Sequence, residues 1–148
     1  MLLHVNTVNI NDMVYITSYI ITTIIFLTLD AIWLGRVAKS FYFLRLSHLI
    51  ASKPNLKIAA LFYACYTAGI VFFAIHPAMT DKCAITALIN GAVFGFLAYG
   101  TYNFTNMATL KDWPNKVSLI DMIWGTALTA ISACSGFWIT TIVITPIL

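Results

Sequence analysis

The chain has 148 residues, of which 61% are hydrophobic and 9% are charged, and its formal net charge is +3. Soluble domains carry about 25% charged residues, and a water-soluble fold of this length cannot bury so much apolar surface. The composition therefore excludes an ordinary soluble domain and predicts an integral membrane protein.

Four stretches contain about the 20 apolar residues that a helix needs to cross the hydrocarbon of a bilayer. They are residues 13–34, 58–75, 84–102 and 117–144. Since none shows period-2 alternation, we predict an all-α fold, an integral membrane four-helix bundle formed as a single domain over residues 1–148. Residues 1–12 hold no Lys or Arg, and no small-residue cleavage site follows, so the first span is expected to remain in the mature protein.

The first span carries a carboxylate near its end, in the run Asp30-Ala31-Ile32-Trp33. A near-copy, Asp121-Met122-Ile123-Trp124, lies near the start of the fourth span. A charged side chain costs roughly 2.5 to 3.5 kcal/mol at the centre of a membrane helix. Because Trp follows Asp by three positions in each motif, both side chains are predicted to project from one helical face.

The loop after the first span combines basic residues with apolar ones. Its apolar members are Phe41, Tyr42, Phe43, Leu44, Leu46, Leu49 and Ile50. We predict an interfacial helix in this loop, with Arg45 interrupting its apolar face. The positive charge of the loop suits contact with anionic lipid headgroups.

The second and third spans also carry polar side chains at helical spacing. Tyr63 and Tyr66 are three positions apart in the second span. Tyr99 and Tyr102 lie at the end of the third span, and Asn103 and Asn106 come just after it. These four residues occupy positions i, i+3, i+4 and i+7. This spacing places the four side chains on one helical face.

The basic residues predict how the spans are oriented. Seven of the eight lie in the first and third loops: Arg36, Lys39, Arg45, Lys53, Lys57, Lys111 and Lys116. The second loop holds only Lys82, and the terminal segments hold none. By the positive-inside rule, the first and third loops are cytoplasmic and both termini are external.

This orientation brings the polar residues to one level. At 1.5 Å per residue, Asp30 and Asp121 both lie roughly 6 to 8 Å inside the cytoplasmic boundary. We therefore predict a polar chamber between the four helices, open toward the cytoplasm. Its candidate residues are Asp30, Trp33, Tyr63, Tyr66, Tyr99, Tyr102, Asn103, Asn106, Asp121 and Trp124.

A purely structural role for these residues stays open. Polar side chains in membrane bundles often form interhelical hydrogen bonds, worth about 0.6 kcal/mol on average. The carboxylates could also pair with Lys116 or Arg36 near the interface. Trp33, Trp113 and Trp124 fit an interfacial aromatic belt.

Small residues recur every four positions in two spans. They are Ala87, Gly91 and Gly95 in the third span, and Gly125, Thr129 and Ala133 in the fourth. Such faces let helices approach closely. They predict tight packing, either within one chain or between the chains of a homo-oligomer.

Several kinds of chemistry have no motif in this sequence. The chain contains no metal-ligand spacing, no nucleophile elbow and no phosphate loop. We therefore predict no cofactor and no metal, and an enzyme is not favoured. Nucleic-acid binding is not supported, because the basic residues fall at the predicted membrane surface. A Cys83–Cys134 bridge and three unpaired thiols are alternatives.

Several motifs carry a resemblance to a known family. They are Ala60-Leu61-Phe62-Tyr63, D-x-I-W-L-G at 30–35, Y-G-T-Y-x-x-T-N-x-A-T-L at 99–110 and D-M-x-W-G at 121–125. Together they resemble an uncharacterised bacterial family of small four-span predicted inner-membrane proteins, a domain of unknown function. The resemblance implies a multi-pass bacterial inner-membrane protein, an association with lipid-modifying enzymes, and an Asp at the position of Asn103.

Three functions follow from these observations. The shallow depth of the polar site favours binding of a lipid or a small amphipathic molecule, with membrane lipids as partners. A small proton-linked transporter is an alternative, although carrier sites usually lie near the bilayer midplane. A structural or assembly protein, in which the polar residues only specify packing, is the other.

Overall fold

The structure is a computed structural model that describes residues 10–147, and this part of the chain holds helices and loops without a strand. The first nine residues, predicted to be external, and Leu148 lie outside the described residues. The helices are α1 (Ile10–Ile32), α2 (Lys39–Leu46), α3 (Leu56–Ile70), α4 (His76–Asp81), α5 (Ala84–Thr109) and α6 (Asn115–Ile144). Two π-helical segments, Trp33–Val37 and Val71–Ile75, continue α1 and join α3 to α4.

Four continuous helical segments are long and apolar enough to cross a membrane. They are Asp12–Val37, Leu56–Asp81, Ala84–Thr109 and Asn115–Ile144. The predicted class, an all-α four-helix membrane bundle, is therefore confirmed. The second and third spans run further than predicted, to Asp81 and Thr109 instead of about 75 and 102.

Local signals explain where the second span begins and ends. The side chain of Asn55 caps its first turn by accepting hydrogen bonds from the amides of Lys57 and Ile58, at 3.2 and 3.3 Å. Pro77 lies in the first turn of α4, directly after the π-helical segment Val71–Ile75. The span ends at Lys82, whose φ of 52° is left-handed.

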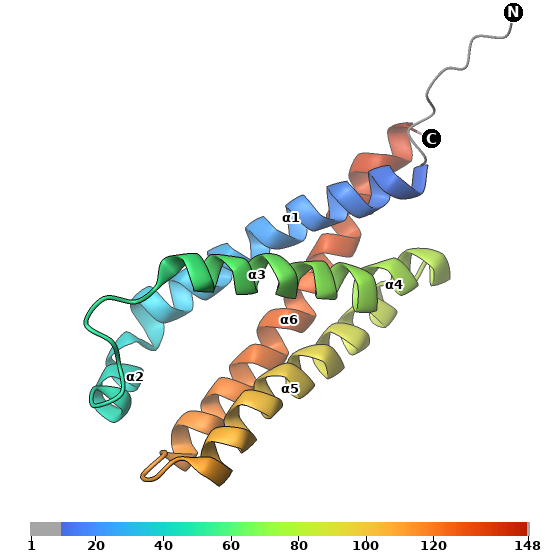
Figure 1. Ribbon diagram of the computed structural model, residues 1–148. Coiled ribbons are helices and arrows are strands. Elements are labelled where there is room, and N and C mark those ends of the chain that lie inside the picture. Colours follow the sequence, from blue (N-terminus) through green and yellow to red (C-terminus); the bar gives the residue numbers. More distant parts are fainter. Residues whose placement is uncertain (1–9, 148) are drawn as a thin grey trace, which may run out of the picture.

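The helices α5 and α6 form a long antiparallel pair (Figure 1). Their small-residue faces are buried against each other within one chain. A Cβ added at Gly91 would lie 2.8 Å from the Cβ of Ala133, and one at Gly95 would lie 2.6 Å from the carbonyl oxygen of Gly125. These faces are thus occupied within the monomer, and oligomerisation stays a prediction.

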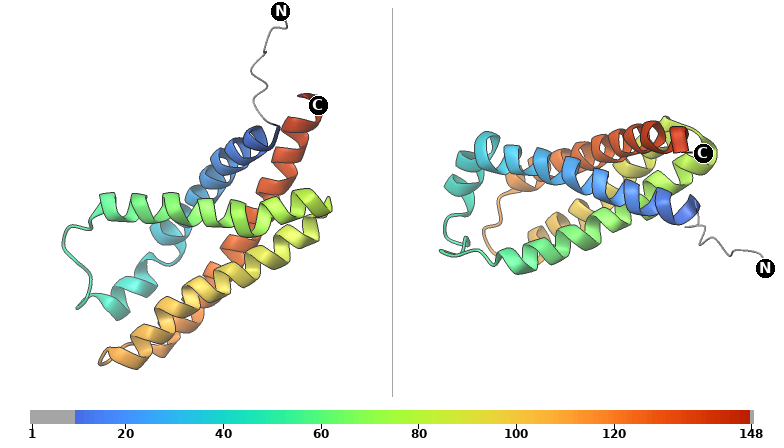
Figure 2. Two further views of the ribbon diagram at one scale, coloured as in Figure 1. Left: turned by 45° about the vertical axis from the view of Figure 1, so that its right-hand side comes forward. Right: turned by 90° about the horizontal axis from the view of Figure 1, so that it is seen from above.

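The helix α1 packs along α6, and α3 crosses the bundle at a steep angle (Figure 2). A core cluster joins these elements around Phe26, Ile70, Ile75 and Leu128, all fully buried. Most other large apolar side chains are exposed, as expected for helices that face lipid. Cys65, Cys83 and Cys134 are free thiols.

One end of the bundle gathers the positive charge. The loop that contains α2 and the turn between α5 and α6 lie at this end, whereas α4 and the C-terminus of α6 lie at the other (Figures 1 and 2). We call it the basic end, defined by residues 36–57 and 110–116. The helix α2 falls within the loop where an interfacial helix was predicted, and Arg45 lies over the ring of Phe41, 4.1 Å from its centroid.

Candidate functional site

Asp30 lies near the basic end of α1, and its side chain is buried, with 5% exposure. Each carboxylate oxygen accepts one hydrogen bond from a different helix. The Tyr63 hydroxyl on α3 donates to Oδ2 at 2.7 Å, and the Trp124 indole N–H on α6 donates to Oδ1 at 3.2 Å. Asp30 therefore ties three spans together.

Asp121 is held in a similar way on α6. The Tyr42 hydroxyl on α2 donates to Oδ1 at 2.8 Å, and the amide of Asn103 on α5 donates to Oδ2 at 2.6 Å. The same amide nitrogen also donates to the carbonyl oxygen of Tyr99 at 3.0 Å. The donors at both carboxylates are neutral, so these hydrogen bonds do not compensate their charge.

Trp33 and Trp124, the aromatic residues of the two motifs, stack on each other. Their ring centroids are 4.2 Å apart, with an interplanar angle of 8°. Because Trp124 also donates to Asp30, the stack and the carboxylate form one unit. Two of the three Trp residues that fit an interfacial aromatic belt thus pack against each other. Their contact joins the two repeated motifs directly.

Two buried polar atoms in this region have no hydrogen-bond partner among the described residues. One is Oδ1 of Asn103, an acceptor on a side chain with no exposed surface. The other is Nε1 of Trp33, a donor. A buried polar group without a partner costs about 1–3 kcal/mol of folding stability. A water molecule or a ligand would satisfy both atoms.

The remaining predicted site residues differ in their placement. The Tyr66 hydroxyl shares a hydrogen bond of 2.9 Å with the hydroxyl of Thr129. Tyr99 is partly buried, and the Tyr102 side chain is 56% exposed. Asn106, although on the predicted face, lines neither of the two cavities described below.

Tyr42 is a site residue that sequence reasoning missed. It was counted only among the apolar members of the loop, yet its hydroxyl reaches Asp121. Burial, and then the negative charge of Asp121, raise the pKa of Tyr42 above its ordinary value of 10.0. The one available signal is that a buried Tyr hydroxyl usually finds a partner.

Two cavities open beside Asp121. One, of about 550 Å³, lies mainly between α3 and α5, with Phe62, Phe94 and four tyrosines in its lining. The other, of about 600 Å³, lies between α2, the loop before α3, α5 and α6. Asp121 and Tyr102 line both. The carboxylate is therefore within reach of two spaces that are otherwise largely apolar and aromatic.

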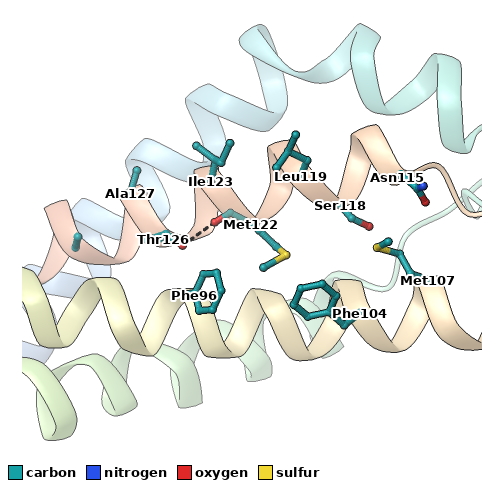
Figure 3. A pocket seen from close by; sticks show the side chains of 11 residues that line it. Phe96, Phe104, Met107, Asn115, Ser118, Leu119, Met122, Ile123, Thr126 and Ala127 are labelled. Carbon is teal, nitrogen blue, oxygen red and sulfur yellow. Dashed lines mark hydrogen bonds between the residues drawn. The ribbon is translucent and has the colours of Figure 1, made fainter.

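A larger cavity, of about 680 Å³, lies in the groove between α5 and α6 (Figure 3). Phe96, Phe104, Met107 and Met122 point into it, and its few polar members include Thr126, which donates to the carbonyl oxygen of Met122 at 2.7 Å. Neither carboxylate lines it. Its apolar lining suits the acyl chains of bilayer lipid, and it offers no polar chemistry comparable to Asp121.

The chemistry open to this site is that of hydrogen bonding and charge. Among the described residues, no group of three or more His, Cys, Asp or Glu is arranged to hold a metal ion. The carboxylates can accept hydrogen bonds or bind a cation, and the tyrosines offer hydroxyls beside apolar walls. An amphipathic molecule matches this combination.

Comparison with known proteins identifies a family. No curated protein and no solved structure matches the chain. A family model, DUF2177, described as a predicted membrane protein, matches residues 15–138. This match covers the second and third spans, most of the first and fourth, and both Asp-x-Ile-Trp motifs. The chain therefore belongs to the DUF2177 family of membrane proteins.

Proposed function

We propose that this protein binds the polar head of a lipid or of another small amphipathic molecule at the site between Asp30 and Asp121. The observation that carries the proposal is that the Asp121 carboxylate lines two cavities whose other walls are mainly apolar and aromatic. A head group that hydrogen-bonds to the carboxylate can thus keep its apolar part against these walls.

The dimensions of the cavities support this function. Ligand pockets usually measure about 300–1,000 Å³ and combine apolar walls with a few polar groups, and the two cavities measure about 550 and 600 Å³. The cavity between α3 and α5 adds the residues Tyr63, Tyr66 and Tyr99 to Asp121. Each has a flat ring and a hydroxyl, which suits the boundary between a head group and a chain.

The proposed setting is a bacterial inner membrane with the basic end in the cytoplasm. The positive-inside rule supports this orientation, since seven basic residues lie at that end. The site then lies close to the level of the inner-leaflet headgroups. A bilayer lipid could approach it sideways, without leaving the membrane.

The location of the site separates this proposal from a proton-linked carrier. Carrier sites usually lie near the bilayer midplane, where broken helices meet. Here Asp30 lies seven residues before the end of the first span at Val37, and Asp121 lies six residues after the start of the fourth span at Asn115. This shallow position favours a ligand that stays at one surface.

The proposal can be tested by native mass spectrometry of the protein purified with its membrane lipids. We expect the wild type to retain a bound lipid or amphiphile that Asp121→Asn loses. Asp112→Asn is the matched control, since it removes the same charge from the exposed turn between α5 and α6 and should keep the ligand. Equal retention by the wild type and both variants would overturn the proposal.

Flux and packing assays distinguish the alternatives. A carrier predicts that Asp30→Asn and Asp121→Asn abolish proton-coupled flux in liposomes. A purely structural role predicts that both variants keep cellular function and change only stability. Our proposal predicts instead that a correctly folded Asp121→Asn protein has lost its ligand.

A further inference from the structure

We propose that the head group bound at this site carries a positive charge, and that the ligand is a zwitterionic phospholipid with an ammonium group. The ammonium would lie in the cavity between α2, α5 and α6, against Asp121 and the rings of Tyr42, Tyr102 and Trp113. This inference rests on the proposed function and names the class of ligand.

The first argument is charge. Asp121 receives its hydrogen bonds from the neutral side chains of Tyr42 and Asn103. An ionised carboxylate offers about four lone-pair sites, so two hydrogen bonds leave it able to accept more. Asp121 is partly buried, and an ionised carboxylate that is partly removed from water is stabilised by a compensating charge. A cationic group in the adjoining cavity supplies one, whereas a purely anionic head group would be repelled.

The second argument is the use of the Asn103 amide. Its nitrogen donates to Asp121 and to the carbonyl oxygen of Tyr99, and Asn103 lines neither cavity beside Asp121. Asn103 therefore has no further N–H for the carboxylate. Additional hydrogen bonds to Asp121 are left to a group in the cavity.

The third argument is the aromatic lining. Tyr42, Tyr102 and Trp113 surround the same cavity as Asp121. Tyr102 and Trp113 meet edge to face, with centroids 5.9 Å apart and an interplanar angle of 82°, so they present faces in two directions. Aromatic faces attract ammonium cations, and aromatic cages recognise choline-like groups. The Trp113 ring is fixed by its N–H, which donates to the Ser118 hydroxyl at 2.8 Å.

The fourth argument is the arrangement of the rest of the cavity. Lys39 lines it together with Asp121, so one cavity has both an acidic and a basic member. This pairing suits a zwitterion, with its ammonium at Asp121 and its phosphate at Lys39. Leu46, Ile50 and Val117 supply apolar surface for the start of the acyl chains.

The test uses the full-length protein in nanodiscs of equimolar phosphatidylethanolamine and phosphatidylglycerol with identical acyl chains. Native mass spectrometry after extraction reports which lipid stays bound. We expect the wild type to retain phosphatidylethanolamine over phosphatidylglycerol by about tenfold, which one carboxylate and an aromatic cage can supply. Tyr102→Leu and Trp113→Leu should bring this ratio close to one.

Two controls keep the outcome clear. Tyr102 donates to neither carboxylate in the network described above, so Tyr102→Leu leaves that network in place. Trp138→Leu changes an exposed Trp on another part of α6 and should keep the wild-type ratio. A wild-type ratio in both Tyr102→Leu and Trp113→Leu would overturn the inference.

The result also separates this inference from the proposed function. If the wild type retains phosphatidylglycerol as well as phosphatidylethanolamine, and Asp121→Asn loses both, the lipid site stands and the cationic head group is wrong. If Asp121→Asn retains as much lipid of each kind as the wild type, both the inference and the proposed function are wrong.

Discussion

The indole N–H of Trp124 donates to Asp30 across 94 positions of sequence, at 3.2 Å. The hydrogen bond joins the Trp of one Asp-x-Ile-Trp motif to the Asp of the other. Trp33 does not donate to Asp121 in return. Among the described residues Nε1 of Trp33 has no partner, and Tyr42 donates to Asp121 instead. The repeated motif therefore builds an asymmetric site, with both cavities on the side of Asp121.

Replacing Trp124 by Phe should destabilise the protein. The variant keeps an aromatic ring that can stack on Trp33 but removes one of the two donors to the buried Asp30. We expect a loss of about 1–3 kcal/mol in the free energy of unfolding, measured by thermal or denaturant unfolding in detergent. Trp138→Phe, at an exposed position of the same helix, is the control, and equal losses in the two variants would contradict the expected result.

Asp30 and Tyr63 should be energetically coupled. A double-mutant cycle with Asp30→Asn, Tyr63→Phe and the double variant isolates the contribution of their 2.7 Å hydrogen bond. We expect a coupling energy of about 0.5–3 kcal/mol, as for other pairs in direct contact. Tyr19→Phe, which removes a hydroxyl bonded to the Ala64 carbonyl, should show no coupling to Asp30→Asn; coupling of the same size would point to a non-specific effect.

A methyl group at position 125 should disturb the site from the α5–α6 interface. A Cβ at Gly125 would overlap the ring of Tyr99, whose carbonyl oxygen accepts from Asn103. We expect Gly125→Ala to cost about 1–3 kcal/mol, as overpacked cores do, and to weaken ligand binding at Asp121. Gly35→Ala is the matched control, because a Cβ there has no atom within 4 Å. A Gly125→Ala protein as stable as Gly35→Ala would contradict this packing.

Stability should fall at alkaline pH partly through Tyr42. Burial and the charge of Asp121 raise the pKa of Tyr42 above 10.0, so the folded protein holds this proton more tightly than the unfolded chain. The resulting stabilisation is complete below about pH 10 and is lost as the pH rises through the folded-state pKa.

Unfolding measured between about pH 8 and 11 tests this linkage. We expect Tyr42→Phe to reduce the loss of stability above pH 10, by up to about 1.4 kcal/mol per pH unit, the effect of one proton. Phe43→Leu, an exposed neighbour on α2, should keep the wild-type slope. If the free energy of unfolding of Tyr42→Phe falls with pH as steeply as that of the wild type, Tyr42 does not contribute to the alkaline loss of stability.

The sequence was sufficient to predict the four spans, and it placed several polar residues at one level. Asp30, Tyr63, Asn103 and Asp121 could be assigned to one level because helix rise and loop charge are regular. The third span was predicted too short because its polar residues lower the hydropathy after Tyr102. The helix continues there to Thr109, since Asn103 faces Asp121 and not lipid.

Other parts of the site depend on tertiary packing that helical periodicity does not encode. The docking of α2 onto α6, which brings Tyr42 to Asp121, depends on the bend at Ala38 between the π-helical segment Trp33–Val37 and α2. The stacking of Trp33 on Trp124 depends on how close α1 and α6 approach. Asn106 shares the helical face of Asn103 but lines neither cavity beside Asp121, a difference that helical spacing does not encode.

The most direct test of the proposed binding site is photo-crosslinking with a phospholipid that carries a diazirine on its acyl chain, mapped by peptide mass spectrometry. We expect labelling of residues that line the two cavities beside Asp121, such as Phe62 and Leu46, with loss in Asp121→Asn and retention in Asp112→Asn. Labelling confined to the groove between α5 and α6, around Phe96 and Met122, and unchanged in Asp121→Asn, would contradict a lipid site at Asp121.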